Sequence, residues 1–141
     1  MWVEVTLSDP LTGTVYFRTG SLDPNGDLLN YHSEYVANGT LPEDSLLVLF
    51  NGTPIDENGE ETPFFWRAAS VVNRTIPAFQ SRTANYYLFA PQTTTPLRLT
   101  VRLRFRSFPP YLFRAIGMDD LIDELIIFDM ETYEQTINIT S

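Results

Sequence analysis

Residues 97–105 alternate between apolar and polar side chains without a break, and no other stretch of the chain constrains its fold as tightly. The odd positions carry the apolar side chains Leu97, Leu99, Val101, Leu103 and Phe105, and the even positions carry Arg98, Thr100, Arg102 and Arg104. Because successive side chains of a strand point to opposite faces, this pattern predicts a strand over 97–105 with an apolar face toward the core. Arg106 continues the polar positions beyond it.

A proline pair marks the end of this strand. Pro109 and Pro110 cannot donate to a strand ladder, and Pro110 suits the first position of a helix. We therefore expect a helix of about two turns over 111–116, ended by Gly117 in the left-handed conformation. The following segment, MDDLIDEL, predicts a further helical turn with Asp119 as its N-cap.

Shorter patterns predict the other strands. Residues 3–7 and 15–17 alternate and flank the turn sequence SDPLTG, which predicts a hairpin. The polar stretch 21–45 carries two turn signals and predicts a long loop with one short helix or strand inside it. Segments of strand length follow at 45–50, 63–72, 85–91, 126–130 and 132–139, with a turn-rich segment at 51–61. The first and last strands are candidates for pairing with each other.

These segments together predict an all-β protein. About eight strands at roughly ten-residue spacing, joined by Pro-rich and Asn-Gly-rich connections, favour an antiparallel β-sandwich, jelly-roll-like, with one or two short helices near residues 110–125. A chain of 141 residues fits a single domain over 1–141, which is either a whole protein or a fragment of a larger secreted one.

The composition excludes several functional classes. The absence of cysteine excludes disulfides, thiol catalysis, zinc ribbons and covalent haem attachment through Cys-x-x-Cys-His. No apolar run is long enough for a membrane span, and no signal-peptide pattern is present. A net charge of −9 disfavours a nucleic-acid partner. Four Asn-x-Thr sequons predict either glycans in a secreted eukaryotic protein or simple turns: Asn38, Asn51, Asn73 and Asn138.

All nine basic residues are arginine, and several of them share the polar face of the 97–105 strand. One interpretation is a solvated face whose arginines pair across strands with some of the eighteen carboxylates. The other is a docking face that grips propionates, phosphates or an acidic partner through its forked guanidinium groups. That docking face would comprise Arg98, Arg102, Arg104 and Arg106.

The segment LDPNGDLLNYHSE offers oxygen ligands. With Glu34, the residues Asp23, Asn25 and Asp27 have the spacing of an EF-hand loop, but Leu28 stands where that loop needs glycine. An EF-hand is therefore disfavoured, which leaves a less regular Ca²⁺ site at these three residues or a plain Pro-Asn-Gly turn.

No catalytic constellation accompanies the single histidine, and we predict that the chain is not an enzyme. His32 lacks a nucleophile to activate and is expected to pack between Tyr31 and Tyr35. Within each of the acid pairs 119–120 and 123–124, the two residues are adjacent in sequence and therefore point to different sides. This disfavours a glycosidase, whose two carboxylates face one substrate.

The aromatic residues allow two roles, core packing or a flat sugar-binding platform. The platform candidates are Trp66, Tyr86 and Tyr87. We expect Trp2, Tyr31 and Tyr35 at the surface, because they lie in loops or at a strand start.

Four segments, VYFRTGSLDPNGDL, PFFWRAASVVNRTIPAFQSRTANYYLFAP, LRLTVRLRFRSFPPYLFRAIG and IIFDM, together resemble the haem-free β-rich region at the C-terminal end of certain bacterial multihaem c-type cytochromes. The resemblance implies a non-catalytic extension of a secreted or periplasmic electron-transfer protein, packed against haem-bearing parts or subunits. The chain itself attaches no haem, although Met118, Met130 or His32 are candidates to cap a haem iron of another segment; the alternative for the methionines is a buried or edge position.

Two hypotheses remain from the sequence. The first is an interaction domain of an extracytoplasmic electron-transfer cytochrome, with the arginine face and the Pro-Pro helix as its contact surface. The second is a carbohydrate-binding β-sandwich, with or without Ca²⁺.

Overall fold

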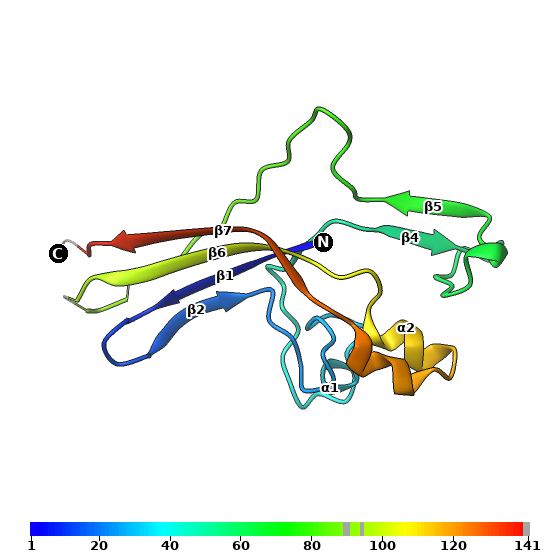
Figure 1. Ribbon diagram of the computed structural model, residues 1–141, viewed down its shortest axis with the longest axis horizontal. Coiled ribbons are helices and arrows are strands. Elements are labelled where there is room, and N and C mark those ends of the chain that lie inside the picture. The colour runs from blue at the N-terminus through cyan, green and yellow to red at the C-terminus, as the bar shows by residue number, and fades with distance from the viewer. Residues whose placement is uncertain (89–90, 94, 140–141) are drawn as a thin grey trace.

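The computed structural model describes residues 1–88, 91–93 and 95–139, and most of its regular structure is β-strand (Figure 1). The strands are β1 (Trp2–Ser8), β2 (Val15–Thr19), β3 (Val48–Leu49), β4 (Gly52–Ile55), β5 (Ser70–Asn73), β6 (Leu97–Phe105) and β7 (Phe128–Ile137). The helices are α1 (Glu34–Ala37) and α2 (Pro110–Ala115), with 3₁₀ turns η1 (Phe65–Arg67) and η2 (Asp119–Glu124).

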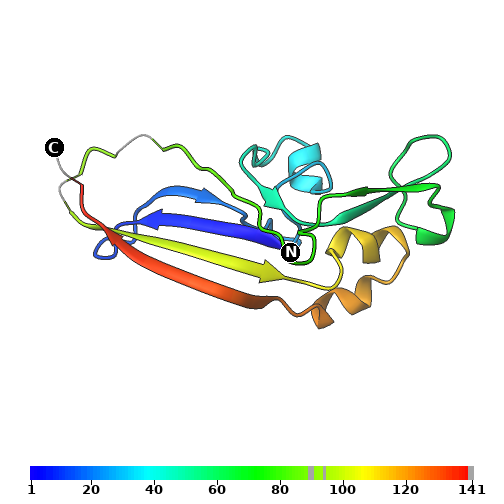
Figure 2. The ribbon, with the colours of Figure 1, turned by 90° about the horizontal axis from the view of Figure 1, so that it is seen from above.

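The strands form one large sheet and one hairpin. The large sheet has the order β2-β1-β6-β7, with β3 also paired to β1, and β4 pairs with β5 in a separate two-stranded sheet. Every pair is antiparallel, which confirms the all-β, antiparallel class. The hairpin extends away from the end of the large sheet, beside α2 (Figures 1 and 2). The sandwich and jelly-roll arrangement stays a prediction.

The most strongly patterned region folds as predicted. β6 spans 97–105, α2 begins at Pro110, and Gly117 has a φ of 72° just beyond the helix. The prediction of Asp119 as a helix cap was wrong, because Met118 occupies the cap position of η2 and no side chain caps it.

Other boundaries differ from the prediction. The β1–β2 hairpin and a short helix in the 21–45 loop are confirmed. The strand predicted at 45–50 shrinks to β3, while β4 lies in a stretch predicted as turns. Residues 85–88 are not a strand, and 89–90 lie outside the described residues. The two C-terminal strands are one, β7, and β1 and β7 flank β6 instead of pairing with each other.

The apolar core is small for a chain of this length. Across β1 and β6, Val5 lies opposite Val101 and Leu7 opposite Leu99, so these side chains share one face of the sheet. The described parts of the stretch between β5 and β6, which lack helix and strand, run back along the sheet (Figure 2). The buried apolar residues among those described are Trp2, Val5, Leu7, Leu28, Phe50 and Leu97.

Within the described residues, the structure has no helix of the length and apolar character that crossing a membrane requires.

Candidate functional site

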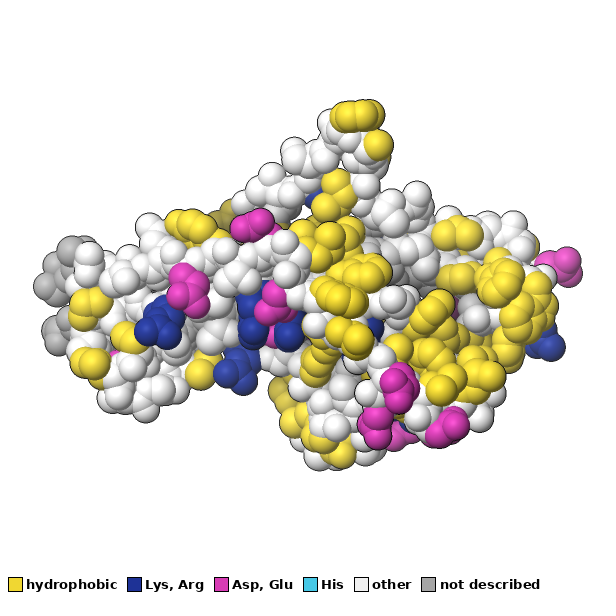
Figure 3. All heavy atoms as spheres, viewed as in Figure 1, with side chains coloured by type: hydrophobic (Ala, Val, Ile, Leu, Met, Phe, Trp, Pro, Cys, Tyr) yellow, Lys and Arg dark blue, Asp and Glu magenta, His cyan; other side chains and the backbone are white. Residues whose placement is uncertain are grey.

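The polar face of the large sheet carries a network of four charged residues, here called the charge ladder. Glu4 on β1 lies opposite Arg102 on β6, and its carboxylate accepts hydrogen bonds from Arg102 Nε at 3.1 Å and from an Arg104 terminal nitrogen at 2.7 Å. Asp129 on β7 accepts from Arg104 Nε at 2.8 Å. Hydrogen bonding to Glu4 raises the pKa of Arg102. Figure 3 shows acidic and basic side chains gathered together over the large sheet.

The four arginines predicted as one docking face therefore have three different environments. Arg102 and Arg104 are paired across strands, as the first interpretation of the arginine face expected. Arg98 is exposed near the other end of β6. Arg106 follows the end of β6, where it is half-buried and donates to the carbonyl oxygen of Gly26 at 2.7 Å.

Arg106 lies in a low-dielectric environment. Its guanidinium carbon is 5.6 Å from the centroid of the Trp2 ring, within range of a cation–π interaction. Desolvation, followed by repulsion from Arg104, lowers the pKa of Arg106 to about 10. No ion pair to Arg106 occurs in the part of the chain that the structure describes.

The predicted Ca²⁺ ligands are tied to other groups of the chain. The Asp23 carboxylate accepts from the Asp27 backbone N–H at 2.9 Å and from Ser33 Oγ at 2.6 Å. Asp27, which is fully buried, accepts from the Tyr111 backbone N–H at 2.9 Å and forms an ion pair with Arg114. These bonds fasten the loop to both the first and the last turn of α2.

Asn25, the third predicted ligand, donates to Glu34 at 3.2 Å, and both side chains are on the outside of the loop. Among the residues described, no group of three or more acidic, histidine or cysteine side chains is arranged to hold a metal ion. The Ca²⁺ site stays a prediction.

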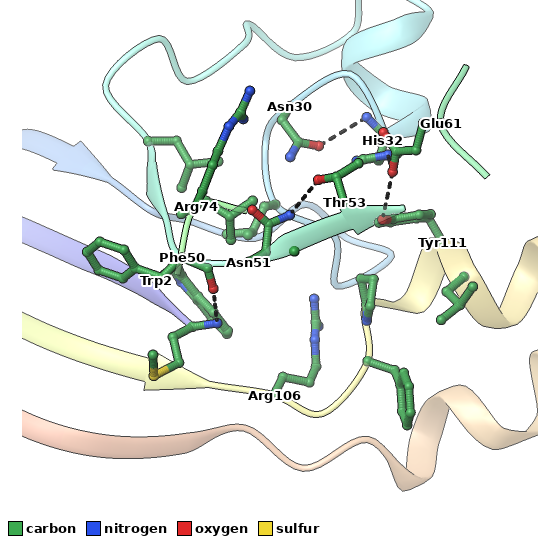
Figure 4. Close-up of a pocket in the computed structure, with 18 of the residues that line it drawn as sticks. Trp2, Asn30, His32, Phe50, Asn51, Thr53, Glu61, Arg74, Arg106 and Tyr111 are labelled. Carbon is green, nitrogen blue, oxygen red and sulfur yellow. Dashed lines mark hydrogen bonds and ion pairs between the residues drawn. The ribbon is translucent and has the colours of Figure 1, made fainter. Parts of the chain in front are cut away.

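A pocket of about 640 Å³ lies where the end of the large sheet meets the β4–β5 hairpin, the loop before α1 and the start of α2 (Figure 4). Arg106 and Trp2 come from the sheet end, His32 from the loop, Glu61 from the hairpin and Tyr111 from α2. Several chain segments far apart in sequence thus supply its wall.

An aromatic stack forms one side of this pocket. The His32 ring is stacked on Tyr111, with centroids 3.8 Å apart and planes at 2°, and its other face lies near Tyr31, with centroids 4.0 Å apart. The predicted neighbour Tyr35 was wrong: Tyr111, from a distant helix, takes that place.

Glu61 binds all three rings of the stack. Its carboxylate accepts from Tyr31 Oη at 2.6 Å. It also lies 2.9 Å from His32 Nε2 and 3.5 Å from Tyr111 Oη, which are labelled in Figure 4. The hydrogen bonds hold the hairpin, the loop and α2 together around one carboxylate. We refer to these four residues as the Glu61 cluster.

Burial sets the protonation of the cluster. Desolvation, with hydrogen bonding to Glu61, raises the pKa of Tyr31 to about 12. Desolvation, with the charge of Glu61, also raises the pKa of Tyr111. Desolvation lowers the pKa of His32 although Glu61 opposes the shift. Near neutral pH both phenols therefore keep their protons and direct them to Glu61, and the oxygens of the cluster can accept a hydrogen bond from a ligand.

The residues predicted for a sugar platform belong to separate clusters. Trp66 is 68% exposed and packs against Phe64 and Phe65 in and beside η1. Tyr86 packs instead against Phe17 of β2. Tyr87, beside it in sequence, is 89% exposed.

Of the residues expected at the surface, Tyr31 is exposed and Tyr35 is half-buried. The prediction for Trp2 was wrong: only 2% of it is exposed, because its indole N–H donates to the Gly20 carbonyl at 3.0 Å and Arg104 and Arg106 lie over its ring.

Apolar side chains are exposed around α2, η2 and the start of β7, which we call the α2–η2 surface (Figure 3). Two of them, Met118 and Met130, are the methionines considered as haem ligands, and both are about half-exposed. The exposed acids Asp119, Asp120, Asp123 and Glu124 lie on the same 3₁₀ turn. The α2–η2 surface comprises Phe108, Ile116, Met118, Leu121, Ile126, Phe128 and Met130.

Sequence reasoning missed Glu61 and Tyr111 as partners of His32. Glu61 stands 29 residues after His32, in a segment interpreted as a turn, and no local pattern links the two. The only available signal was the Pro-Pro step, which predicted the helix but not the cluster that its first turn joins.

A scan of protein-family models, a search of curated proteins and a search of solved structures each found no match to this chain.

Proposed function

We propose that this chain is a non-catalytic interaction domain of an extracytoplasmic multihaem electron-transfer protein, and that the α2–η2 surface is its docking face. The observation that carries the proposal is the exposure of seven large apolar side chains on that surface. Exposed apolar patches that are bordered by polar residues mark protein–protein contact sites.

The open edge of β7 supports the same conclusion. β7 is ten residues long, every residue in it except Ile137 is exposed, and no strand among the described residues pairs with its outer edge. Long uncovered edges invite pairing with another chain, so natural proteins cover or blunt them. We infer that a partner covers β7, and that a second layer supplied by this partner would complete the predicted sandwich.

Charge and sequence indicate the chemistry of the partner. The four acids of η2 favour a partner whose contact surface carries basic residues around an apolar centre. The resemblance of VRLRFRSFPPYLFRAIG and the other quoted segments to the haem-free region of multihaem cytochromes supports a haem-bearing segment or subunit as that partner. Arg102 and Arg104 are already paired with Glu4 and Asp129 within the sheet, so they are not assigned to docking.

The test begins with the native source. An antibody against this domain should detect a band or a co-precipitated complex that stains for haem on electrophoresis. The haem protein identified in this way is then purified, and its affinity for the domain is measured. Changing Leu121 and Ile126 together to Asp should weaken binding at least tenfold, because two apolar contacts become charged. As a control, Arg98→Gln, at the far end of β6, should leave the affinity unchanged. A native source that yields no haem-stained species would reject the electron-transfer assignment.

A second candidate function, carbohydrate binding, is supported by the exposed rings of Phe65 and Trp66 in η1, since Phe65 also lines the pocket. Trp66 is exposed on η1 whereas Trp2 is buried in the pocket wall, so a sugar stacked on η1 would change mainly the fluorescence of Trp66. Trp66→Ala should abolish such a change. A glycan panel that leaves the fluorescence unaltered would reject this candidate.

A further inference from the structure

We infer that the pocket described above binds a small aromatic monocarboxylate, with the ligand carboxylate on Arg106 and the ligand ring among the apolar side chains of the pocket. This pocket shares Phe108 with the edge of the proposed docking surface, but its other lining residues lie outside that surface, and the inference does not depend on the docking function.

Arg106 supplies the anion-binding group. A guanidinium has five N–H donors, and the described contacts of Arg106 use one terminal nitrogen, which binds the Gly26 carbonyl. Figure 4 shows the side chain pointing from the end of β6 into the pocket. Asp23 attracts Arg106 only at longer range, because the Asp23 carboxylate is occupied by Asp27 and Ser33. A partly desolvated cation without a bound carboxylate favours an anionic ligand, which a guanidinium binds bidentately.

The rest of the wall fits an aromatic body. The pocket volume, about 640 Å³, is in the range of sites for small organic molecules. Rings and aliphatic side chains form an apolar part of the pocket lining, which favours offset or edge contacts with a ligand ring. These side chains are Trp2, Phe50, Phe105, Phe108 and Leu112.

Two further features narrow the ligand class. The Glu61 cluster lines the same pocket, where its carboxylate and phenol oxygens can accept a hydrogen bond from a ligand hydroxyl group. The charged groups that line the pocket are the carboxylates Glu43, Asp44 and Glu61 and, besides Arg106, Arg74 and the amino group of Met1, so the wall has no excess of positive charge that would favour a dianion such as a phosphate ester over a monoanion. A hydroxylated aromatic acid therefore matches the wall better than a phosphate.

The experiment compares two probes of the same shape. Binding of 4-hydroxyphenylacetate and of its neutral amide, 4-hydroxyphenylacetamide, to the full chain is measured by ligand-observed NMR and calorimetry at low salt. We expect a Kd of about 1 mM or tighter for the acid. The amide should bind at least about tenfold more weakly, because it lacks the charge that pairs with Arg106.

Variants then locate the site. Arg106→Gln should weaken binding of the acid about tenfold or more, whereas Arg98→Gln, an exposed arginine near the other end of the same strand, should bind like the wild type. Leu112→Trp fills the pocket without changing its charge and should abolish binding. Circular dichroism confirms the fold of each variant, and the acid–amide comparison on the wild type decides the case if Arg106→Gln does not fold.

Three results would overturn the inference. They are equal affinity for acid and amide, wild-type affinity in a folded Arg106→Gln or Leu112→Trp variant, and no binding of the acid at about 10 mM, a concentration at which even a weak specific site would show occupancy.

Discussion

Glu4 and Arg102 lie directly opposite each other on β1 and β6, with Arg102 Nε 3.1 Å from the Glu4 carboxylate, and they are separated by 98 residues of sequence. Arg104 binds the other oxygen of the same carboxylate at 2.7 Å. Two arginines thus share one nearly buried acid, which explains how an arginine-bearing strand face is accommodated in an acidic chain. The ladder joins the N-terminal strand to the strand that precedes α2.

Glu4→Gln should lower the free energy of unfolding by about 2 kcal/mol, because two partly buried guanidinium groups lose their shared counter-ion. Urea denaturation measures the change from the midpoint at constant m-value. Glu134→Gln is the matched control: Glu134 is exposed on β7, has no ion pair among the described residues, and should change stability by less than about 0.5 kcal/mol. If the two substitutions change the free energy of unfolding equally, the charge ladder contributes no more to stability than an exposed surface charge.

Gly20→Ala should be far more destabilising than Gly13→Ala, although both glycines have a φ of 74°. A Cβ at Gly20 would lie 2.3 Å from the Val3 carbonyl oxygen, a backbone atom, whereas nothing lies within 4 Å of one at Gly13. The positive φ alone costs about 1 kcal/mol, and the clash at Gly20 should add at least about 2 kcal/mol. Thermal and urea unfolding of both variants measure the difference. Similar losses would show that β1 can move away from Gly20.

His32 should titrate below its ordinary pKa of 6.5, because desolvation by its surroundings outweighs the attraction of Glu61. Since it is the only histidine, a single imidazole resonance in the NMR spectrum reports its titration. In Glu61→Gln the titration midpoint should fall further, because the charge that raises the pKa is gone. A midpoint that rises in this variant would contradict the assigned balance of burial and charge.

The same shift predicts how stability depends on pH. Above pH 6.5 His32 is neutral in both the folded and the unfolded state, so it does not lower the free energy of unfolding. Because its folded pKa lies below its unfolded pKa, the unfolded state binds the proton first, and stability is lost as the pH falls through the folded pKa. Between pH 7.5 and 5.5 the wild type should therefore lose more stability than His32→Gln. Parallel curves for the two proteins would show that His32 is not linked to unfolding.

Asp27→Asn should lower stability by about 3 kcal/mol, because Arg114 would lose its buried partner and α2 would be held less firmly to the loop. Asp120→Asn, on exposed η2, is the control and should have little effect. Addition of Ca²⁺ or of a chelator should not shift the melting temperature of the wild type, because Arg114 already neutralises Asp27. A rise in melting temperature with Ca²⁺ would instead support the predicted cation site.

Patterns within a few neighbouring residues allowed parts of the fold to be predicted. The alternation over 97–105 specified both ends of β6, because a period of two and a proline pair are local signals. Pro110 and Gly117 marked the limits of α2 for the same reason. β4 was missed because Gly52 and Pro54 indicate turns, and only its pairing with β5 makes it a strand.

The candidate site depended on contacts that local patterns do not record. Tyr31 and His32 are adjacent in sequence, but Glu61 and Tyr111 reach them only through the fold. Trp2 was predicted at the surface because a strand start is commonly exposed, and its burial depends on Arg104 and Arg106, a hundred residues away. The tertiary contact overrode the local expectation in both cases.

The position of β1 between β2 and β6 also has a consequence for the order in which the protein is made. As the chain emerges from the ribosome, β1 can pair at once with β2 and later with the short β3, but β6, which pairs along the whole of β1, is synthesised much later. Bringing such distant segments together costs loop entropy before any contact repays it, so we expect slow folding. Until β6 is synthesised, the edge of β1 that β6 will occupy stays open, so we expect this edge to be a site of mispairing during folding.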